Sequence, residues 1–81
     1  MRTALIGIIV EEPQSVEKLN GILHDYREVI IGRMGLPRPE RGMSIISIAV
    51  EADNNIISAL SGKLGALSGV STKTIYSKKE A

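Results

Sequence analysis

The sequence predicts an α+β fold whose elements follow the order strand, helix, strand, strand, helix, strand. Three observations predict it. Runs rich in isoleucine and valine begin near residues 3, 29, 43 and 70. Apolar residues recur at helical spacing between the first and second of these runs, and again between the third and fourth. Glycine or proline separates the elements. A chain of 81 residues has room for one domain, expected over residues 1–81.

The first strand and the first helix are expected before residue 27. Thr3–Glu11 reads as a β-branched run without a polar face, which is typical of a central strand covered on both sides. Pro13 ends this run. Apolar residues then follow helical spacing as far as Tyr26, with Ser15 as the expected N-cap.

The second strand is expected over Val29–Leu36. Gly32 and Gly35 interrupt it, and glycines inside strands often mark bulges or sheet edges, so we place it at an edge. Pro37–Gly42 contains two prolines, which lack backbone donors and restrict the residue before them. We therefore expect this segment to be a loop that joins two strands as a hairpin.

The second half repeats the plan of strand, helix, strand. Met43–Val50 is expected to be an isoleucine-rich strand, and Asp53 the N-cap of a second helix. Helical spacing continues to Leu67 and ends at the breaker Ser68-Gly69. In Val70–Tyr76, polar residues alternate with apolar ones, which suits an edge strand.

This plan is that of a ferredoxin-like sandwich, with an antiparallel sheet ordered 4-1-3-2 and two helices on one face. The other face of the sheet is then bare. Alternation leaves two candidates for it, and both are too apolar for water, so we expect a dimer or tetramer that pairs through this face. The candidates are Leu5 and Ile9 with Met43 and Ile45, or Ala4, Ile6, Ile8 and Val10 with Ile46, Ile48 and Val50.

Composition narrows the class of protein. Without cysteine, phenylalanine or tryptophan, the core must consist of Ile, Leu, Val and Met, and disulfides are excluded. Oligomerisation is then the expected reinforcement of a small core. A net charge of +1 without charged blocks argues against direct nucleic-acid binding. The longest apolar run is too short to span a bilayer and no leader is visible, so no membrane association and a cytoplasmic location are expected.

No catalytic arrangement can be recognised, so we expect no enzyme activity and no cofactor. Glu11 and Glu12 are adjacent and are interpreted as solvated residues before a turn. His24 is the only histidine, and we interpret it as a favourable partner for a helix C-terminus rather than a metal ligand. No metal site is therefore predicted.

Two features favour binding. The helix segment Gly62-Lys63-Leu64-Gly65 lacks the spacing of a phosphate loop, and its glycines are attributed first to close packing and second to a small ligand. Arg33, Arg38 and Arg41 are expected to cluster around the hairpin, where guanidinium groups hold carboxylates or phosphates well.

Short motifs along the chain match a known family. They are Arg33, Gly35 and Pro37 at the hairpin, Asp53, Asn54 and the run Leu60–Gly65 at the second helix, and the pair Leu23-His24 in the first helix. On these motifs, residues 33–74 resemble the family of iron-only hydrogenase system regulators, and the first 32 residues agree in plan. The resemblance implies a fold similar to ACT domains and to the metal-sensing domain of the nickel-responsive repressor, and a role in regulating the hydrogenase system. The histidines of the nickel sensor fall at about Arg33 and Gly35, so nickel sensing of that kind should be lost.

We therefore expect a regulatory module that binds a small metabolite or a protein of the hydrogenase system and has no DNA-binding segment of its own. An alternative is a non-catalytic accessory subunit of an enzyme. The candidate binding residues are Arg33, Arg41, Asp53, Asn54, Ser61 and Lys63.

Overall fold

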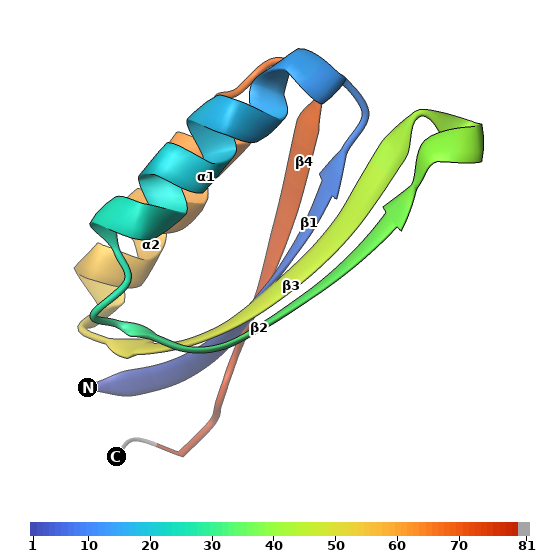
Figure 1. The fold of residues 1–81 in the computed structure, drawn as a ribbon. Coiled ribbons are helices and arrows are strands. Elements are labelled where there is room, and N and C mark those ends of the chain that lie inside the picture. The colour runs from blue at the N-terminus through green and yellow to red at the C-terminus, as the bar shows by residue number, and fades with distance from the viewer. Residues whose placement is uncertain (80–81) are drawn as a thin grey trace.

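The computed structural model describes residues 1–79 and contains the predicted order of elements (Figure 1). Residues 80 and 81 of the expected domain lie outside the described residues. Two short 3₁₀ helices, η1 (Pro13–Ser15) and η2 (Pro39–Arg41), precede α1 and β3. The main elements are β1 (Arg2–Val10), α1 (Val16–Asp25), β2 (Ile30–Arg38), β3 (Met43–Ala52), α2 (Asn54–Gly65) and β4 (Val70–Tyr76).

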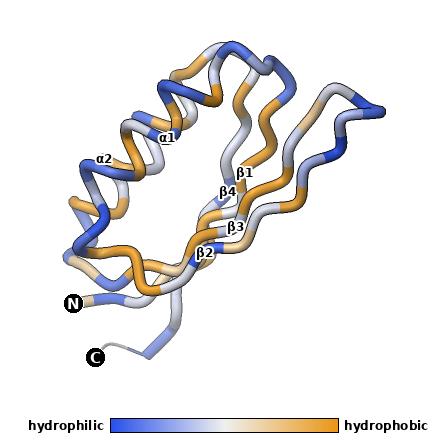
Figure 2. The backbone as a smooth tube through the Cα atoms, viewed as in Figure 1, coloured by the Kyte–Doolittle hydropathy of each residue, from blue (hydrophilic) through white to orange (hydrophobic). Residues whose placement is uncertain are grey.

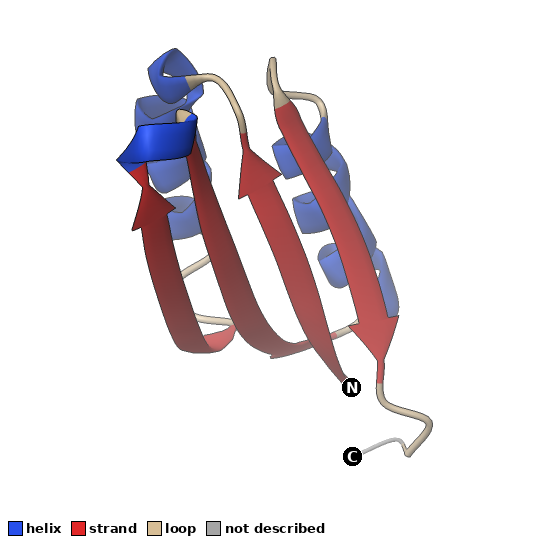
Figure 3. Ribbon diagram, turned by 90° about the vertical axis from the view of Figure 1, so that its right-hand side faces the viewer, coloured by secondary structure: helices blue, strands red, loops and turns tan. Residues whose placement is uncertain are grey.

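The four strands form one antiparallel sheet in the order β2-β3-β1-β4, which confirms the predicted order 4-1-3-2. β1 and β3 are central, with Arg2 opposite Ala52, and β4 pairs with β1 so that Val70 lies opposite Val10. Both helices cover the same face of the sheet (Figure 3). The ferredoxin-like α+β sandwich is therefore confirmed. Within residues 1–79, neither helix is long and apolar enough to cross a membrane.

Alternation along the central strands decides which face carries the core. Every second residue of β1 from Ala4 to Val10 is buried, and the residues that face them on β3 are largely buried too. Figure 2 shows these hydrophobic stretches beneath the two helices. The helices add their own apolar stripes, so the core is one aliphatic layer between sheet and helices. Its helical members are Leu19, Leu23, Ile57, Leu60 and Leu64.

The opposite face of the sheet is bare and apolar. Leu5 and Ile9, the first of the two candidate sets, are 44% and 42% exposed, and Ile75 beside them on β4 is 68% exposed. Gly7 and Ser47 at the centre of this face are small, and a shallow hollow of about 320 Å³ lies over them. One face of the sheet therefore has no helix over it, as predicted. We call it the bare sheet face.

The hairpin between β2 and β3 differs from its prediction. Pro37 and Arg38 were expected in the loop, but both belong to β2 and lie opposite Ser44 and Met43. A proline is tolerated here because β2 is an edge strand, where an N–H that points away from the neighbouring strand is not needed. The connection is only η2 and Gly42, which has a φ of 65°.

The predicted caps are in position but do not cap with their side chains. Ser15 occupies the N-cap of α1, yet its hydroxyl donates to the main-chain oxygen of Ser68 at 2.6 Å. Asp53 occupies the N-cap of α2, and only its main-chain oxygen accepts helical hydrogen bonds, from Ile56 and Ile57. The spacing of apolar residues predicted both helix starts correctly. The hydrogen-bond partner of each cap side chain depends on tertiary contacts instead.

Glu12 and Gly69 lock the loop after β1 to the loop before β4. The carboxylate of Glu12, expected to be solvated, is half-buried and accepts hydrogen bonds from Ser68 Oγ at 2.6 Å and Gln14 Nε2 at 3.0 Å. Gly69 has a φ of 71°, and a Cβ there would lie 2.5 Å from Glu12 Cγ. The interpretation of Glu12 as a solvated residue was wrong, because this close approach brings the α2–β4 loop onto it.

Helix α2 lies close against β4. The Ser61 hydroxyl is 3.4 Å from Thr72 Oγ1 and accepts a hydrogen bond from Thr74 Oγ1 at 3.2 Å. A Cβ at Gly65 would stand 3.2 Å from Thr72 Oγ1, whereas a Cβ at Gly62 would meet nothing within 4 Å. Close packing thus accounts for Gly65 but not for Gly62, which is exposed.

Candidate functional site

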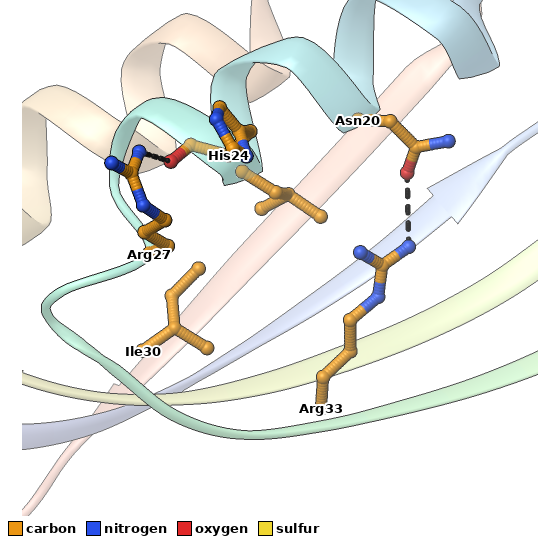
Figure 4. Close-up of a pocket in the computed structure, with 6 residues that line it drawn as sticks. Asn20, His24, Arg27, Ile30 and Arg33 are labelled. Carbon is orange, nitrogen blue, oxygen red and sulfur yellow. Dashed lines mark hydrogen bonds between the residues drawn. The ribbon is translucent and has the colours of Figure 1, made fainter.

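Helix α1 and strand β2 leave a cavity between them, at the opposite edge of the sheet from the close contact of α2 with β4. It has a volume of about 360 Å³ and opens to solvent near the C-terminal end of α1 (Figure 4). Four of its residues come from α1 or the turn after it, and two come from β2. The lining residues are Asn20, Leu23, His24, Arg27, Ile30 and Arg33.

The two arginines of the cavity are each held by one hydrogen bond. Arg33 lies opposite Ile48, on the helix-facing side of β2, and its Nη2 donates to Asn20 Oδ1 at 2.9 Å. Arg27 Nη1 donates to the main-chain oxygen of His24 at 2.9 Å, which satisfies a carbonyl at the end of α1. A guanidinium has five N–H donors, so each arginine keeps donors for a ligand.

Figure 4 shows Arg27 and Arg33 on two sides of Ile30, with His24 and Asn20 above them on α1. The side chain of Leu23 is buried and that of Ile30 is half-buried, so the cavity has an apolar floor. Polar groups that surround an apolar floor are typical of small-molecule sites.

The charges around the cavity have one sign. No acidic side chain lines it, and the one ion pair within residues 1–79, Arg38 with Glu40 at 2.6 Å, lies in the hairpin. Arg27 offsets the negative partial charge of the α1 C-terminus. Charge-assisted hydrogen bonds from two guanidinium groups suit a carboxylate or a phosphate. This cavity is the candidate functional site.

His24 would need further ligands beside it to bind a metal ion. In the described part of the chain, no three His, Cys, Asp or Glu side chains come together as a metal site. His24 lies in the last turn of α1 and lines the same cavity as Arg27 and Arg33.

Of the predicted binding residues, only Arg33 lines this cavity. The arginines do not cluster, because β2 is extended and places Arg38 about 16 Å along the strand from Arg33 at roughly 3.3 Å per residue. Arg41 lies beyond it in η2, exposed at the tip of the hairpin.

The remaining candidates lie on α2 or at its N-cap. Two of them are exposed, and the other two contact neighbouring elements of the fold. Asp53 and Asn54 are exposed at the helix start, and Ser61 bonds to the threonines of β4. Lys63 Nζ stands 5.2 Å from the centre of the Tyr26 ring, a cation–π contact that joins α2 to α1. The structure does not bring these residues together with Arg33.

Sequence reasoning missed Asn20, Arg27 and Ile30 and set His24 aside. One signal was available. Asn20, His24 and Arg27 are spaced by four and three residues, which places them on one side of a helix and its C-terminal turn. Pairing that stripe with Arg33 required knowing that α1 lies above β2.

Comparisons with known proteins agree with this fold. The family model TM1266-like, iron-only hydrogenase system regulator, a role given as provisional for the family, matches residues 2–74. The structure of uncharacterized protein TM1266 from Thermotoga maritima superposes with a TM-score of 0.90 at 40% identity, covering 95% of this chain and 98% of that one.

A second solved structure is similar in fold alone. It is a formyltetrahydrofolate deformylase from Pseudomonas putida KT2440, with a TM-score of 0.64, 10% identity and coverage of 90% of this chain and 28% of that one. No curated protein matches the sequence. On the family match and the 40% identity, the chain belongs to the TM1266-like family of iron-only hydrogenase system regulators.

Proposed function

We propose that the chain is a regulatory module that binds a small anionic metabolite in the α1–β2 cavity. One observation carries this function. Two arginines and a histidine line one cavity with an apolar floor, and no acidic side chain is among the lining residues. A carboxylate or phosphate would replace water on the free N–H groups of Arg27 and Arg33. The role is one of binding, and no reaction is assigned to it.

Self-association is the second part of this function. Leu5, Ile9 and Ile75 form an exposed apolar strip across β1 and β4, and such patches mark interaction surfaces. A second copy on the bare sheet face would give a dimer or tetramer. Each copy would keep its cavity free, since the cavity lies on the helical side. A protein of the hydrogenase system is then the proposed receiver of the signal.

Thermal unfolding with small anions tests the binding site. Acetate, phosphate and anionic amino acids each serve as probes, and a ligand of the native state raises Tm with its concentration. We expect at least one carboxylate or phosphate to do so, and Arg27→Ala and Arg33→Ala to abolish the rise. Lys73→Ala, which removes a cation from the opposite face, should leave it unchanged. Equal shifts in all four proteins would refute the site.

Sedimentation velocity tests the self-association. The unmodified chain should sediment as a dimer or tetramer, and Leu5→Glu should shift it towards the monomer because a charge would be buried between the copies. Asn55→Glu, at an exposed position on α2 away from the bare sheet face, is the control. A monodisperse monomer at high concentration would refute the pairing. Co-migration with a large enzyme in a cell extract would favour the accessory subunit.

A further inference from the structure

The α1–β2 cavity does not end at Arg33. A second hollow of about 220 Å³ shares Asn20 and Arg33 with it and continues along Gly35 and Leu36. A third hollow, of about 370 Å³, shares Val16, Pro37 and Ser44 with the second. The three hollows form one row between α1 and the β2–β3 hairpin, and the Asn20–Arg33 hydrogen bond crosses this row between the first hollow and the second. We call it the α1–β2 groove.

The two ends of the groove differ in chemistry. Arg27, His24 and Arg33 stand at one end. The hollow at the other end has no charged residue in its lining, and three of its members are prolines. No acidic residue lines any part of the groove. The residues of the uncharged end are Val10, Pro13, Val16, Pro37, Pro39, Gly42, Met43 and Ser44.

We infer that the α1–β2 groove binds a linear monocarboxylate with an unbranched alkyl chain, which rests on the proposed function of the cavity. The carboxylate lies between Arg27 and Arg33 and replaces Asn20 Oδ1 as the acceptor of Arg33. This opens the Asn20–Arg33 bridge and lets the chain extend past Gly35 towards Met43. Charge complementarity fixes this orientation, because two arginines line the first hollow and no charged residue lines the third. A short anion would leave the apolar end in water, and a cationic amphiphile would meet two arginines.

The groove also limits the length of the chain. Val16 and His24 stand eight residues apart on α1, a distance of about 12 Å at 1.5 Å per residue. The alkyl part of a medium-chain acid spans this distance. Each methylene that leaves water for the groove should tighten binding about fourfold, until the chain reaches the open end near Pro39.

Isothermal titration with a homologous series tests this. Acetate, butanoate, hexanoate, octanoate and decanoate are titrated into the full chain below their micelle concentrations. The Kd should fall about fourfold per added methylene and level off by decanoate. Decyltrimethylammonium of matched length should not bind.

One variant separates the two ends of the groove. Gly35 lines its middle, opposite Ile46, and a Cβ there would meet nothing within 4 Å. Gly35→Leu should therefore fold and fill the passage, leaving the Kd of acetate unchanged and removing the gain from longer chains. Met34→Leu, the neighbouring position on the bare sheet face, is the matched control and should keep the full gain.

The outcomes distinguish this inference from the proposed function. If the Kd is the same for every chain length, the alkyl chain lies outside the groove and the inference is overturned while the anion site stands. If no anion binds, both fail. If Gly35→Leu changes the sedimentation coefficient and chain length has no effect, a second copy occupies the groove, which also overturns the inference.

Discussion

The two outer strands of the sheet meet their helices in different ways. On the side of β4, small residues and hydroxyls let α2 come close, with Gly65 against Thr72 and Ser61 bonded to both threonines of the strand. On the side of β2, two long polar side chains, Asn20 and Arg33, bridge from α1 to the strand. One side of the sandwich is therefore closed by packing, and the other is held open as a groove.

This difference shows how one fold can provide both a core and a site. β2 has only exposed residues after Ile30, since no helix packs directly on it. Residues on the closed side should therefore control stability, whereas residues on the open side should control binding. Four paired substitutions test that division, from the largest expected effect to the smallest.

Leucine truncation should separate the two sides most strongly. Leu60 on α2 has no exposed surface, and Leu60→Ala should lower the free energy of unfolding by roughly 3–4 kcal/mol because it leaves a cavity. Leu36 on β2 is 50% exposed, and Leu36→Ala should cost less than about 1 kcal/mol. Urea unfolding of both variants measures the difference. Equal losses would show that the open side also carries core stability.

The two glycines with positive φ should differ for the same reason. Gly69→Ala adds a Cβ that overlaps Glu12 and adopts a left-handed conformation, so we expect a loss of roughly 2–3 kcal/mol. Gly42→Ala in the hairpin should lower the free energy of unfolding by about 1 kcal/mol, from the left-handed conformation alone, because open space surrounds the added Cβ. Thermal unfolding compares them. A smaller loss at Gly69 would mean that the loop around Glu12 yields readily.

Removing one polar bridge from each side gives a smaller contrast. Ser61→Ala breaks a half-buried hydroxyl cluster and should cost about 1 kcal/mol. Asn20→Ala breaks the exposed hydrogen bond to Arg33 and should change stability by less than about 0.5 kcal/mol. If the groove is the site, Asn20→Ala should still alter the Kd for anions, because Arg33 loses its support. Ser61→Ala should leave that Kd unchanged.

The smallest contrast lies within one helix. Gly62→Ala should raise the free energy of unfolding by about 0.5–1 kcal/mol through helix propensity, since its Cβ would meet nothing. Gly65→Ala should gain less or lose, because its Cβ would press on Thr72 Oγ1. Chemical unfolding resolves the pair when both variants are measured together. An equal gain at both positions would show that α2 can shift away from β4.

The fold could be predicted from the sequence because its signals are local. Isoleucine and valine runs, helical spacing and breakers such as Ser68-Gly69 placed all six main elements close to their observed bounds. One error was local, because Pro37 and Arg38 belong to β2 and not to the loop. The others arose where distant segments meet. Ser15 bonds to Ser68, and Glu12 accepts from the same residue, so neither could be assigned from its neighbours in sequence.

The candidate site was harder to predict for the same physical reason. Arg33 was predicted to bind because it is one of the arginines near the hairpin, but its partners on α1 looked like ordinary surface residues. The contact between Arg33 and these residues depends on where α1 lies over β2, and a pattern within one segment of sequence does not predict that placement. The expected cluster of three arginines failed because an extended strand separates residues that are near in sequence.

The central position of β1 has a consequence for how the chain folds. Its first residue, Arg2, pairs with Ala52, and its last, Val10, pairs with Val70, so both ladders join segments that are distant in sequence. Loop-closure entropy must be overcome before such pairs form, which slows folding. During synthesis the first strand emerges long before β4, and β1 stays unpaired on that edge until β4 has also been made.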